Sequence, residues 1–250
     1  MKTTNLVSIF LLLFLSSCSY NNLMHKTLEK IKVYSDEINY EVDMIKDNKE
    51  LKIIPLRHLG TPKYYDNLKE VLSKYQNLGY VVFYEFMRSN NTNDIRQRKF
   101  RKILPLKINL DSKEQLNYKE ILLKKFRKID PNFEFKQNVI PQPQYNFLIT
   151  DLNNSKNVDI TIEEFVNEYE RLNGAVVLDS CDYVNNWSKS NCETNKRAKG
   201  FDKILIDYRN NNVVDNVLSA TNNKILILYG EGHVKGIKKG LLKNGYKLNK

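Results

Sequence analysis

Three side chains that can bind a metal lie just beyond apolar, strand-like segments. His58 and His233 each precede a helix-like segment, and Glu85 directly follows the apolar run 80–84. Ligands of parallel α/β sheets bind at the carboxyl ends of the strands, so we expect the three residues to meet there. Two imidazoles and a carboxylate suit a catalytic metal site with an open water position. A structural loop histidine and an ordinary strand-terminal glutamate are the alternative interpretation of these residues.

The segments that carry these residues predict an α/β fold with a mainly parallel central sheet and flanking helices. Residues 40–47 and 51–58 have the pattern of a strand hairpin. Thr61 is a predicted N-cap for a helix that ends near Gly79, and the run 80–84 is typical of a buried strand. A strand, a helix and a strand in succession form a βαβ unit, so the strands on either side of this helix should be parallel.

The second half of the chain predicts a helical insertion and the rest of the sheet. The insertion covers about 90–200, and helices are expected near 94–104 and 114–129 and after Thr161, whose spacing to Glu164 is that of a capping box. Further elements follow from local apolar patterns: a strand at 175–178, a helix at 201–219, a buried strand at 224–229, a tight turn at 230–233, a helix at 234–243 and a short strand at 246–248.

The N-terminus resembles a bacterial lipoprotein signal. An apolar stretch follows Lys2, and Leu15-Ser16-Ser17-Cys18 matches the lipobox at every position. The resemblance implies a signal peptide at 1–17, a lipid such as palmitate on Cys18, and anchorage to a bacterial membrane on its non-cytosolic side, in the cell envelope. Residues 18–38 are then expected to be a polar tether, with room for a short helix, before a single domain at 39–250. A secretory signal with a chance cysteine is the alternative.

The charge distribution bears on the binding partners, and the two remaining cysteines bear on a disulfide. The chain has 40 Lys and Arg against 29 Asp and Glu. The lysines are spread out, and no basic run with interleaved aromatic residues suggests nucleic-acid binding, so we expect solvated surface and no nucleic-acid partner. Cys181 and Cys192 flank a polar loop, and an exported protein favours a disulfide between them, worth about 2–3 kcal/mol by loop closure.

Four motifs in order resemble the TraB/GumN family, which belongs with the Tiki metalloproteases. They are His58-Leu59-Gly60-Thr61-Pro62, the strand ending Phe83-Tyr84-Glu85, Asp207-Tyr208-Arg209-Asn210, and Tyr229-Gly230-Glu231-Gly232-His233 with the glycines that follow it. The likeness covers 51–87 and 203–248. One position departs from it, since Pro55 stands where the family's first Gly-x-x-His motif has glycine.

The resemblance implies roles for these residues. His58 and His233 would be metal ligands, Glu85 a ligand or general base, and Arg209 would steady a carboxylate or a developing oxyanion. Mn²⁺ is the ion that the family suggests, and Co²⁺ or Zn²⁺ would also suit the ligands. Gly230 and Gly232 would allow close backbone approach to a ligand, although a tight turn would equally need small residues. The expected substrate contacts are Asn210, Gly230, Glu231 and Gly232.

The sequence therefore predicts a lipid-anchored, metal-dependent hydrolase that cleaves peptide bonds through a metal-activated water. The expected partners are a peptide or protein substrate and the membrane. Two alternatives stay open at this point. The chain could be a non-catalytic surface lipoprotein that binds a peptide or signal molecule, or a hydrolase of a non-peptide ester or lactone.

Overall fold

A computed structural model describes residues 20–38, 42–88, 94–104, 117–183 and 200–249. These residues belong to two compact units. The first comprises Met1–Asn39, Arg57–Ser73 and Asn117–Thr150, and the second comprises Tyr40–Leu56, Lys74–Leu116 and Asp151–Lys250. Among the described residues, no helix is both long enough and apolar enough to cross a membrane.

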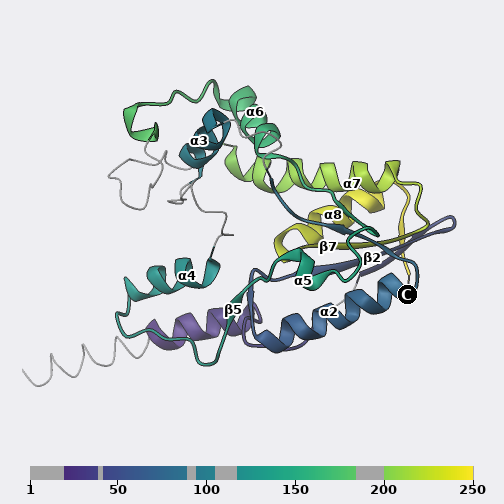
Figure 1. The fold of residues 1–250 in the computed structure, drawn as a ribbon, viewed down its shortest axis with the longest axis horizontal. Coiled ribbons are helices and arrows are strands. Elements are labelled where there is room, and N and C mark those ends of the chain that lie inside the picture. The colour runs from purple at the N-terminus through teal and green to yellow at the C-terminus, as the bar shows by residue number, and fades with distance from the viewer. Residues whose placement is uncertain (1–19, 39–41, 89–93, 105–116, 184–199, 250) are drawn as a thin grey trace, which may run out of the picture. The chain divides into compact units, whose positions relative to one another are not determined.

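The second unit contains a six-stranded sheet that is mostly parallel, which confirms the predicted α/β class (Figure 1). Its strand order is β6-β4-β7-β2-β1-β8. The four strands from β6 to β2 run parallel, and β1 pairs antiparallel with both β2 and β8. The bounds are β1 Val42–Lys46, β2 Lys49–Leu56, β4 Val81–Tyr84, β6 Ser155–Asn157, β7 Lys224–Gly230 and β8 Lys247–Leu248.

The predicted parallel strands β2 and β4 are present, but they are not neighbours. β7 lies between them and pairs with both, from Glu50↔Lys224 to Leu56↔Gly230 on one side and from Val81↔Ile225 to Tyr84↔Leu228 on the other. Both edges of β7 are paired, and its residues are buried from Ile225 onward. This burial explains why the middle of the strand, residues 225–228, is entirely apolar. Because β7 lies next to β4, the C-terminal ends of these two strands are neighbours in the sheet.

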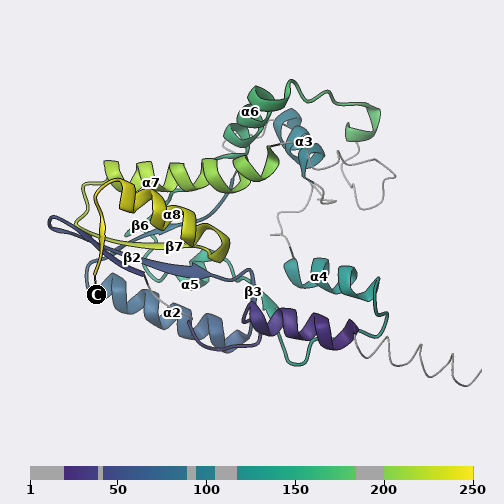
Figure 2. The ribbon, with the colours of Figure 1, turned by 180° about the vertical axis from the view of Figure 1, so that it is seen from behind.

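Helices α7 (Arg209–Ser219) and α8 (Glu231–Lys243) pack together in the same unit, as both ribbon views show (Figures 1 and 2). Val213, Val217, Ile237 and Leu241 join the buried sheet residues in one apolar cluster. Two glycines on α8 permit the close approach. A Cβ at Gly236 would lie 2.0 Å from Asn210 Nδ2, and one at Gly240 would lie 2.7 Å from Val214 Cγ2.

A smaller apolar cluster in the second unit joins α3 (Asp94–Ile103) to α6 (Ile162–Asn173). The two helices lie side by side in Figures 1 and 2. The predicted capping box of α6 is confirmed, because Thr161 Oγ1 accepts from the backbone of Glu164 and the Glu164 carboxylate accepts from the backbone of Thr161. The short 3₁₀ helix η1 (Ser180–Tyr183) follows.

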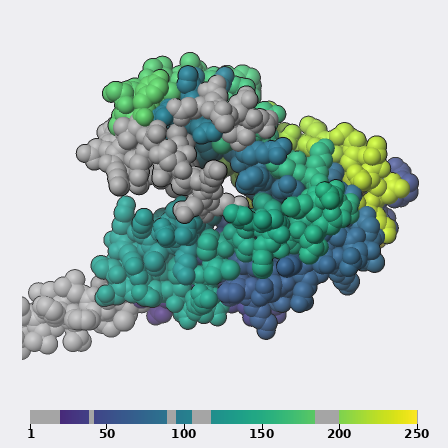
Figure 3. Space-filling view, in the orientation of Figure 1, coloured from purple at the N-terminus to yellow at the C-terminus, as the bar shows by residue number. Residues whose placement is uncertain are grey.

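The first unit contains a helix over 20–30, here α1, with the two-stranded pairing of β3 (Leu59–Gly60) and β5 (Ile140–Pro141). It also holds α4 (Tyr118–Arg127) and α5 (Tyr145–Leu148), and it holds α2 (Pro62–Asn77) up to Ser73. Helix α4 lies at the surface, without a buried residue (Figure 3). The core joins residues from three segments: Met24, Leu28, Val33, Leu59, Phe133 and Val139.

Four local expectations differ from the structure. The expected tether contains a helix over 20–30, but it is not a free polar segment, because Met24 and Leu28 of that helix are buried in the core of the first unit. The predicted turn at 230–233 is the start of α8, because Gly230 is its N-cap and Glu231 its first residue. Residues 175–178 do not form a strand. The expected helix at 201–219 is present, but its first part is a π-helix, η3, over Lys203–Tyr208.

Candidate active site

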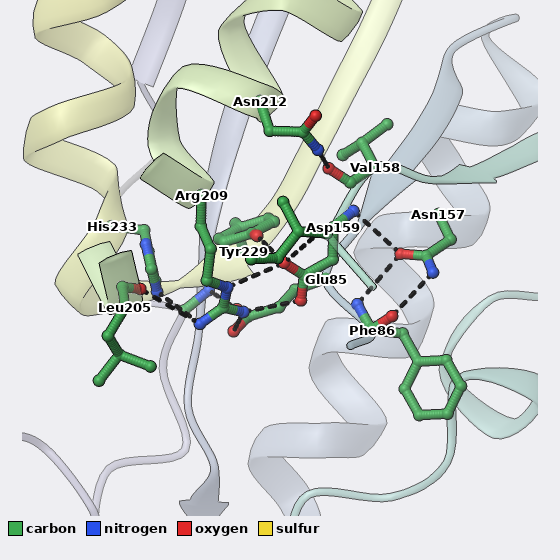
Figure 4. A network of polar contacts seen from close by, with 12 residues as sticks. Glu85, Phe86, Asn157, Val158, Asp159, Leu205, Arg209, Asn212, Tyr229 and His233 are labelled. Atoms are coloured by element: carbon green, nitrogen blue, oxygen red, sulfur yellow. Dashed lines mark hydrogen bonds and ion pairs between the residues drawn. The ribbon is translucent and has the colours of Figure 1, made fainter. Parts of the chain in front are cut away.

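A buried ion-pair cluster lies where the parallel strands β4 and β7 end (Figure 4). The guanidinium of Arg209 donates to Glu85 Oε1 through Nη2 at 2.5 Å. It also donates to Asp159 through Nε at 2.8 Å and through Nη2 at 2.7 Å. The side chains of Arg209, Glu85 and Asp159 are 7%, 9% and 0% exposed, so both ion pairs are shielded from solvent. Such a shielded, fork-shaped pairing fixes the geometry of the carboxylates.

The second oxygen of Glu85 is held by the backbone at the start of α8. Gly230 N–H donates to Glu85 Oε2 at 2.6 Å. Gly230 is the N-cap of α8, so the carboxylate lies at the positive end of that helix. The segment after β4 is itself fixed, because Asn157 accepts from Phe86 N at 3.2 Å and donates to Phe86 O at 2.7 Å. Glu85 is therefore held from two sides.

Asp159 is positioned by three elements. It follows β6, and Asn212 of α7 donates to the carbonyl of Val158 at 2.8 Å. The Tyr229 hydroxyl at the end of β7 donates to Asp159 Oδ1 at 2.8 Å. Tyr229 is fully buried, and the charge of Arg209 lies 5.6 Å from its ring centroid. These contacts connect β6, β7 and α7 at one point.

His233 lies on the first turn of α8 and faces Arg209 and Asn210 of α7. Its Nε2 is 3.3 Å from Arg209 Nη1, and its Nδ1 is 2.8 Å from Asn210 Oδ1. A guanidinium can only donate, so Nε2 is the accepting nitrogen. The proton then resides on Nδ1 and is donated to Asn210. This contact assigns His233 the neutral Nδ1–H tautomer.

The surroundings shift the pKa values of two residues in the cluster. Burial disfavours the charged guanidinium of Arg209, but its hydrogen bonds to Asp159 and the charges of Glu85 and Asp159 outweigh this effect, so the pKa of Arg209 is raised well above its ordinary value. Burial is the main cause that raises the pKa of Tyr229. Arg209 is therefore charged and Tyr229 neutral throughout the physiological range.

The π-helix η3 ends directly before Arg209. Such wide turns are rare and are found frequently at functional sites. A wide turn changes the phase of the helix that follows, so the segment 203–208 sets the directions from which Arg209 and Asn210 leave α7.

The structure brings together most of the predicted site residues. Glu85, Arg209, Asn210, Gly230 and His233 share direct hydrogen bonds in the second unit. His58 belongs to the first unit, where its Nδ1 is 2.9 Å from Gln142 Oε1 and its ring stacks on Tyr118 with centroids 4.7 Å apart.

The predicted substrate contacts fall into two kinds. Asn210 is buried and holds His233, and Gly230 holds Glu85 through its N–H. Glu231 and Gly232 are exposed on the first turn of α8.

The cysteines are only partly described. Cys181 is disulfide-bonded, whereas Cys18 and the predicted partner Cys192 lie outside the described residues. The Cys181–Cys192 pairing and the lipidation of Cys18 stay predictions.

Sequence reasoning missed three residues of the cluster. Asp159 belongs to a stretch, 157–160, that matches the family only weakly, and it was not assigned to the site because β6 reads Ser-Lys-Asn, with no apolar run to mark a strand ahead of it. Tyr229 was included in a motif but was given no role in the site, although its hydroxyl donates to Asp159. Gly236 carries no chemistry, but it makes room for Asn210 beside His233. A carboxylate that follows a parallel strand was the available signal for Asp159.

The donors of the cluster suit a divalent ion in their chemistry. His233 is neutral with its accepting lone pair on Nε2, and its Nδ1–H is bonded to an amide oxygen, as in metal-ligating histidines. Glu85 supplies a buried carboxylate. The Arg209 Nη1 atom lies against His233 Nε2, so ion binding at Nε2 requires this 3.3 Å contact to open. Within the described residues, no three His, Cys, Asp or Glu side chains form a metal-binding group.

No protein-family model matches the chain, and neither a curated protein nor a solved structure is significantly similar to it.

Proposed function

We propose that this protein is a lipid-anchored, metal-dependent hydrolase that cleaves peptide bonds, with its reacting groups at the end of β4 and the start of α8. The observation that carries the proposal is that a neutral, Nδ1-protonated His233 and the buried carboxylate of Glu85, which is held at a helix N-terminus, both contact Arg209. The end of parallel strands is where α/β proteins bind their ligands. The resemblance to the TraB/GumN family points to the same residues.

The protonation state of His233 supports this function. Metal binding requires a neutral imidazole with a lone pair on the ligating nitrogen. Asn210 fixes that state by accepting the Nδ1 proton at 2.8 Å. Because Asn210 leaves α7 next to Arg209, the same helix holds both the imidazole and the carboxylate of Glu85.

A bound divalent ion would lower the pKa of a water molecule and polarise the scissile carbonyl. Glu85 would accept the proton of the attacking water, since its oxygens are oriented by Arg209 and by the N–H of Gly230. Arg209 would orient Glu85 and Asp159 rather than contact substrate, because three of its N–H directions already point to these carboxylates. Glu231 and Gly232, exposed on the same turn, would face the substrate.

His58 would be the third metal ligand, in addition to His233 and Glu85. It belongs to the first unit, so its role as a ligand rests on the sequence resemblance. A separate variant, His58→Ala, is needed to test that role. Anchorage likewise rests on the lipobox at Cys18.

A peptide-cleavage screen in the presence of Mn²⁺, Co²⁺ or Zn²⁺ tests the proposal. We expect hydrolysis that chelation removes and metal restores, and that Glu85→Gln abolishes. Asn210→Ala should weaken metal affinity about 10–100-fold, as loss of the hydrogen bond to a ligating histidine does. Lys239→Gln on the exposed side of α8 is the matched control and should leave hydrolysis unchanged.

The second candidate is a lipoprotein that binds a peptide or signal molecule without catalysis. The mutual pairing of Arg209, Glu85 and Asp159 favours it, because a satisfied buried ion-pair cluster can serve only to fix strand ends and helices. In that case the protein holds no ion at neutral pH, and Glu85→Gln lowers stability without a catalytic consequence.

A further inference from the structure

One face of α1 is turned away from the core of the first unit and combines apolar with basic side chains. Met24, His25 and Leu28 form the buried side of this helix. On the other side, Tyr20 and Leu23 are 54% and 60% exposed. Residues at i, i+3 and i+7 share a face of a helix, so Tyr20, Leu23 and Thr27 form one stripe. The Thr27 hydroxyl donates to the carbonyl of Leu23 at 2.9 Å, which reduces the polarity of that stripe.

Lysines flank this stripe. Lys26 and Lys30 are exposed and lie four residues apart, hence on the same side of the helix. Lys32, also exposed, follows the helix with a positive φ of 55°. Glycine is the usual residue at such a helix end, and a lysine there adds charge at the cost of backbone strain. The nearby acidic side chain, Glu29, is paired with Lys136 at 2.7 Å.

The helix end is held in place by the core. Val33 N–H donates to the carbonyl of Leu28 at 2.9 Å, and Lys32 N–H to that of Glu29 at 2.9 Å. This is the bonding of a Schellman motif, in which the residues on either side of the turn pack together, and Leu28 and Val33 are both buried. Ile31, 49% exposed, is thereby directed outward next to Lys30 and Lys32. The apolar and basic side chains thus belong to a rigid surface.

We propose that this face of α1, defined by Tyr20, Leu23, Lys26, Lys30, Ile31 and Lys32, rests on the anionic surface of a phospholipid membrane. Leucine and tyrosine in the interface with lysines at the headgroups is the composition of interfacial helices. The inference rests on the lipid anchor of the proposed function, because only Ser19 separates Cys18 from Tyr20. Two residues span about 7 Å of extended chain, so a lipid on Cys18 would keep this face close to the bilayer.

This placement goes beyond anchorage. A lipid on a flexible tether would let the domain move freely above the membrane, whereas α1 packed in the core would hold the first unit in one orientation on it. One acyl chain gives only marginal membrane binding, and a basic and apolar surface supplies a second contribution.

The test uses the intact lipoprotein in vesicles and reads the depth of α1. An environment-sensitive fluorophore is attached to Leu23→Cys, and as the matched control to Ile129→Cys, which replaces a side chain of similar exposure, 55%, in the same unit. Vesicles contain phosphatidylglycerol and phosphatidylethanolamine, or phosphatidylcholine alone. We expect a blue-shifted emission, quenched by nitroxide-labelled lipid, for the label at 23 in anionic vesicles and for neither label in phosphatidylcholine. Equal, water-like emission from both labels in anionic vesicles would overturn the proposal.

Two further measurements separate this inference from the anchor itself. Mass spectrometry of the N-terminal peptide shows whether Cys18 carries lipid, so a lipidated protein with a water-exposed label at 23 contradicts the α1 surface alone. If Cys18 carries no lipid, vesicle partition of the full chain is the readout. The double variant Lys26→Gln/Lys30→Gln should then lower partition about 30-fold, from about 1 kcal/mol per lysine at an anionic surface. An unchanged partition would refute the surface.

Discussion

Replacing Gly236 with alanine should disturb the candidate site through packing alone. The new Cβ would lie 2.0 Å from Asn210 Nδ2 and 3.0 Å from Asn210 Cγ, far inside van der Waals contact. Either the Asn210 amide turns away or α7 and α8 move apart. Overpacking of this kind costs about 1–3 kcal/mol. If the amide turns away, the 2.8 Å bond to His233 is lost as well, worth about 1 kcal/mol.

Gly232 supplies the matched control on the same helix. A Cβ at Gly232 meets nothing within 4 Å, and this position is exposed. Alanine is favoured over glycine in helices by about 1 kcal/mol, so Gly232→Ala should be neutral or stabilising. Gly236→Ala receives the same helix-propensity gain, so the two variants should differ in the free energy of unfolding, measured by urea titration, only by the overpacking and by the hydrogen bond if it is lost, about 1–4 kcal/mol.

A double variant isolates the cause. Asn210→Ala removes the amide that Gly236→Ala would strike, and the remaining contact to the Asn210 Cβ is an ordinary 3.6 Å. In the Asn210→Ala background, Gly236→Ala should therefore cost nothing further. The reasoning would be refuted by additive free energies in this cycle, or by a Gly236→Ala variant as stable as Gly232→Ala.

Three further perturbations follow from buried or capping contacts. Asp159→Asn leaves the Arg209 guanidinium without one of its carboxylates and should lower the free energy of unfolding by about 3–5 kcal/mol in urea titration; a loss below about 1 kcal/mol would argue against a charged buried pair. Burial, with a smaller effect of Lys136, lowers the pKa of His25. The unfolded chain therefore binds more protons below about pH 6.5, so stability should fall as pH drops through that value. His25→Gln should flatten this dependence in thermal melts from pH 8 to 5, and an unchanged slope would contradict it. Thr161→Ala removes the N-cap of α6 and should cost about 1 kcal/mol by the same titration; no loss would exclude the cap as a source of stability.

Three of the parallel strands, β2, β4 and β7, were predictable because their sequences are apolar over most of their length, whereas the polar strand β6 was not. The runs that became β4 and β7 are apolar at nearly every residue. Their order in the sheet was not predictable, since the local sequence of β2 and β4 does not reveal that β7 pairs between them. Only the complete chain determines that long-range pairing.

The start of α8 shows how a glycine-rich segment misleads. Gly230 and Gly232 favoured a turn, yet the helix begins at Glu231, whose charge suits a helix N-terminus. The segment that contains α1 misled in the opposite way. Its polar composition suggested a tether, although Met24, Leu28 and Val33 recur at intervals that fit the buried side of a helix and its end.

The candidate site was predictable only in its chemically distinctive residues. Glu85 and His233 stood out because each follows an apolar strand, and Arg209 because of its motif. The contacts that determine their geometry come from Asp159, after a polar strand, and from Gly236, whose role is steric. Packing of α7 on α8 creates that role, so no local pattern could reveal it.

Elemental analysis of the purified intact protein after soaking in Mn²⁺, Co²⁺ or Zn²⁺ tests the central claim most directly. The account predicts about one tightly bound ion per chain, as catalytic sites of this ligand type hold. The ion should be lost in His233→Ala and in His58→Ala and kept in Lys239→Gln, with all three variants folded by circular dichroism. A folded wild-type protein that binds no ion, or a His233→Ala variant that keeps it, would contradict the account.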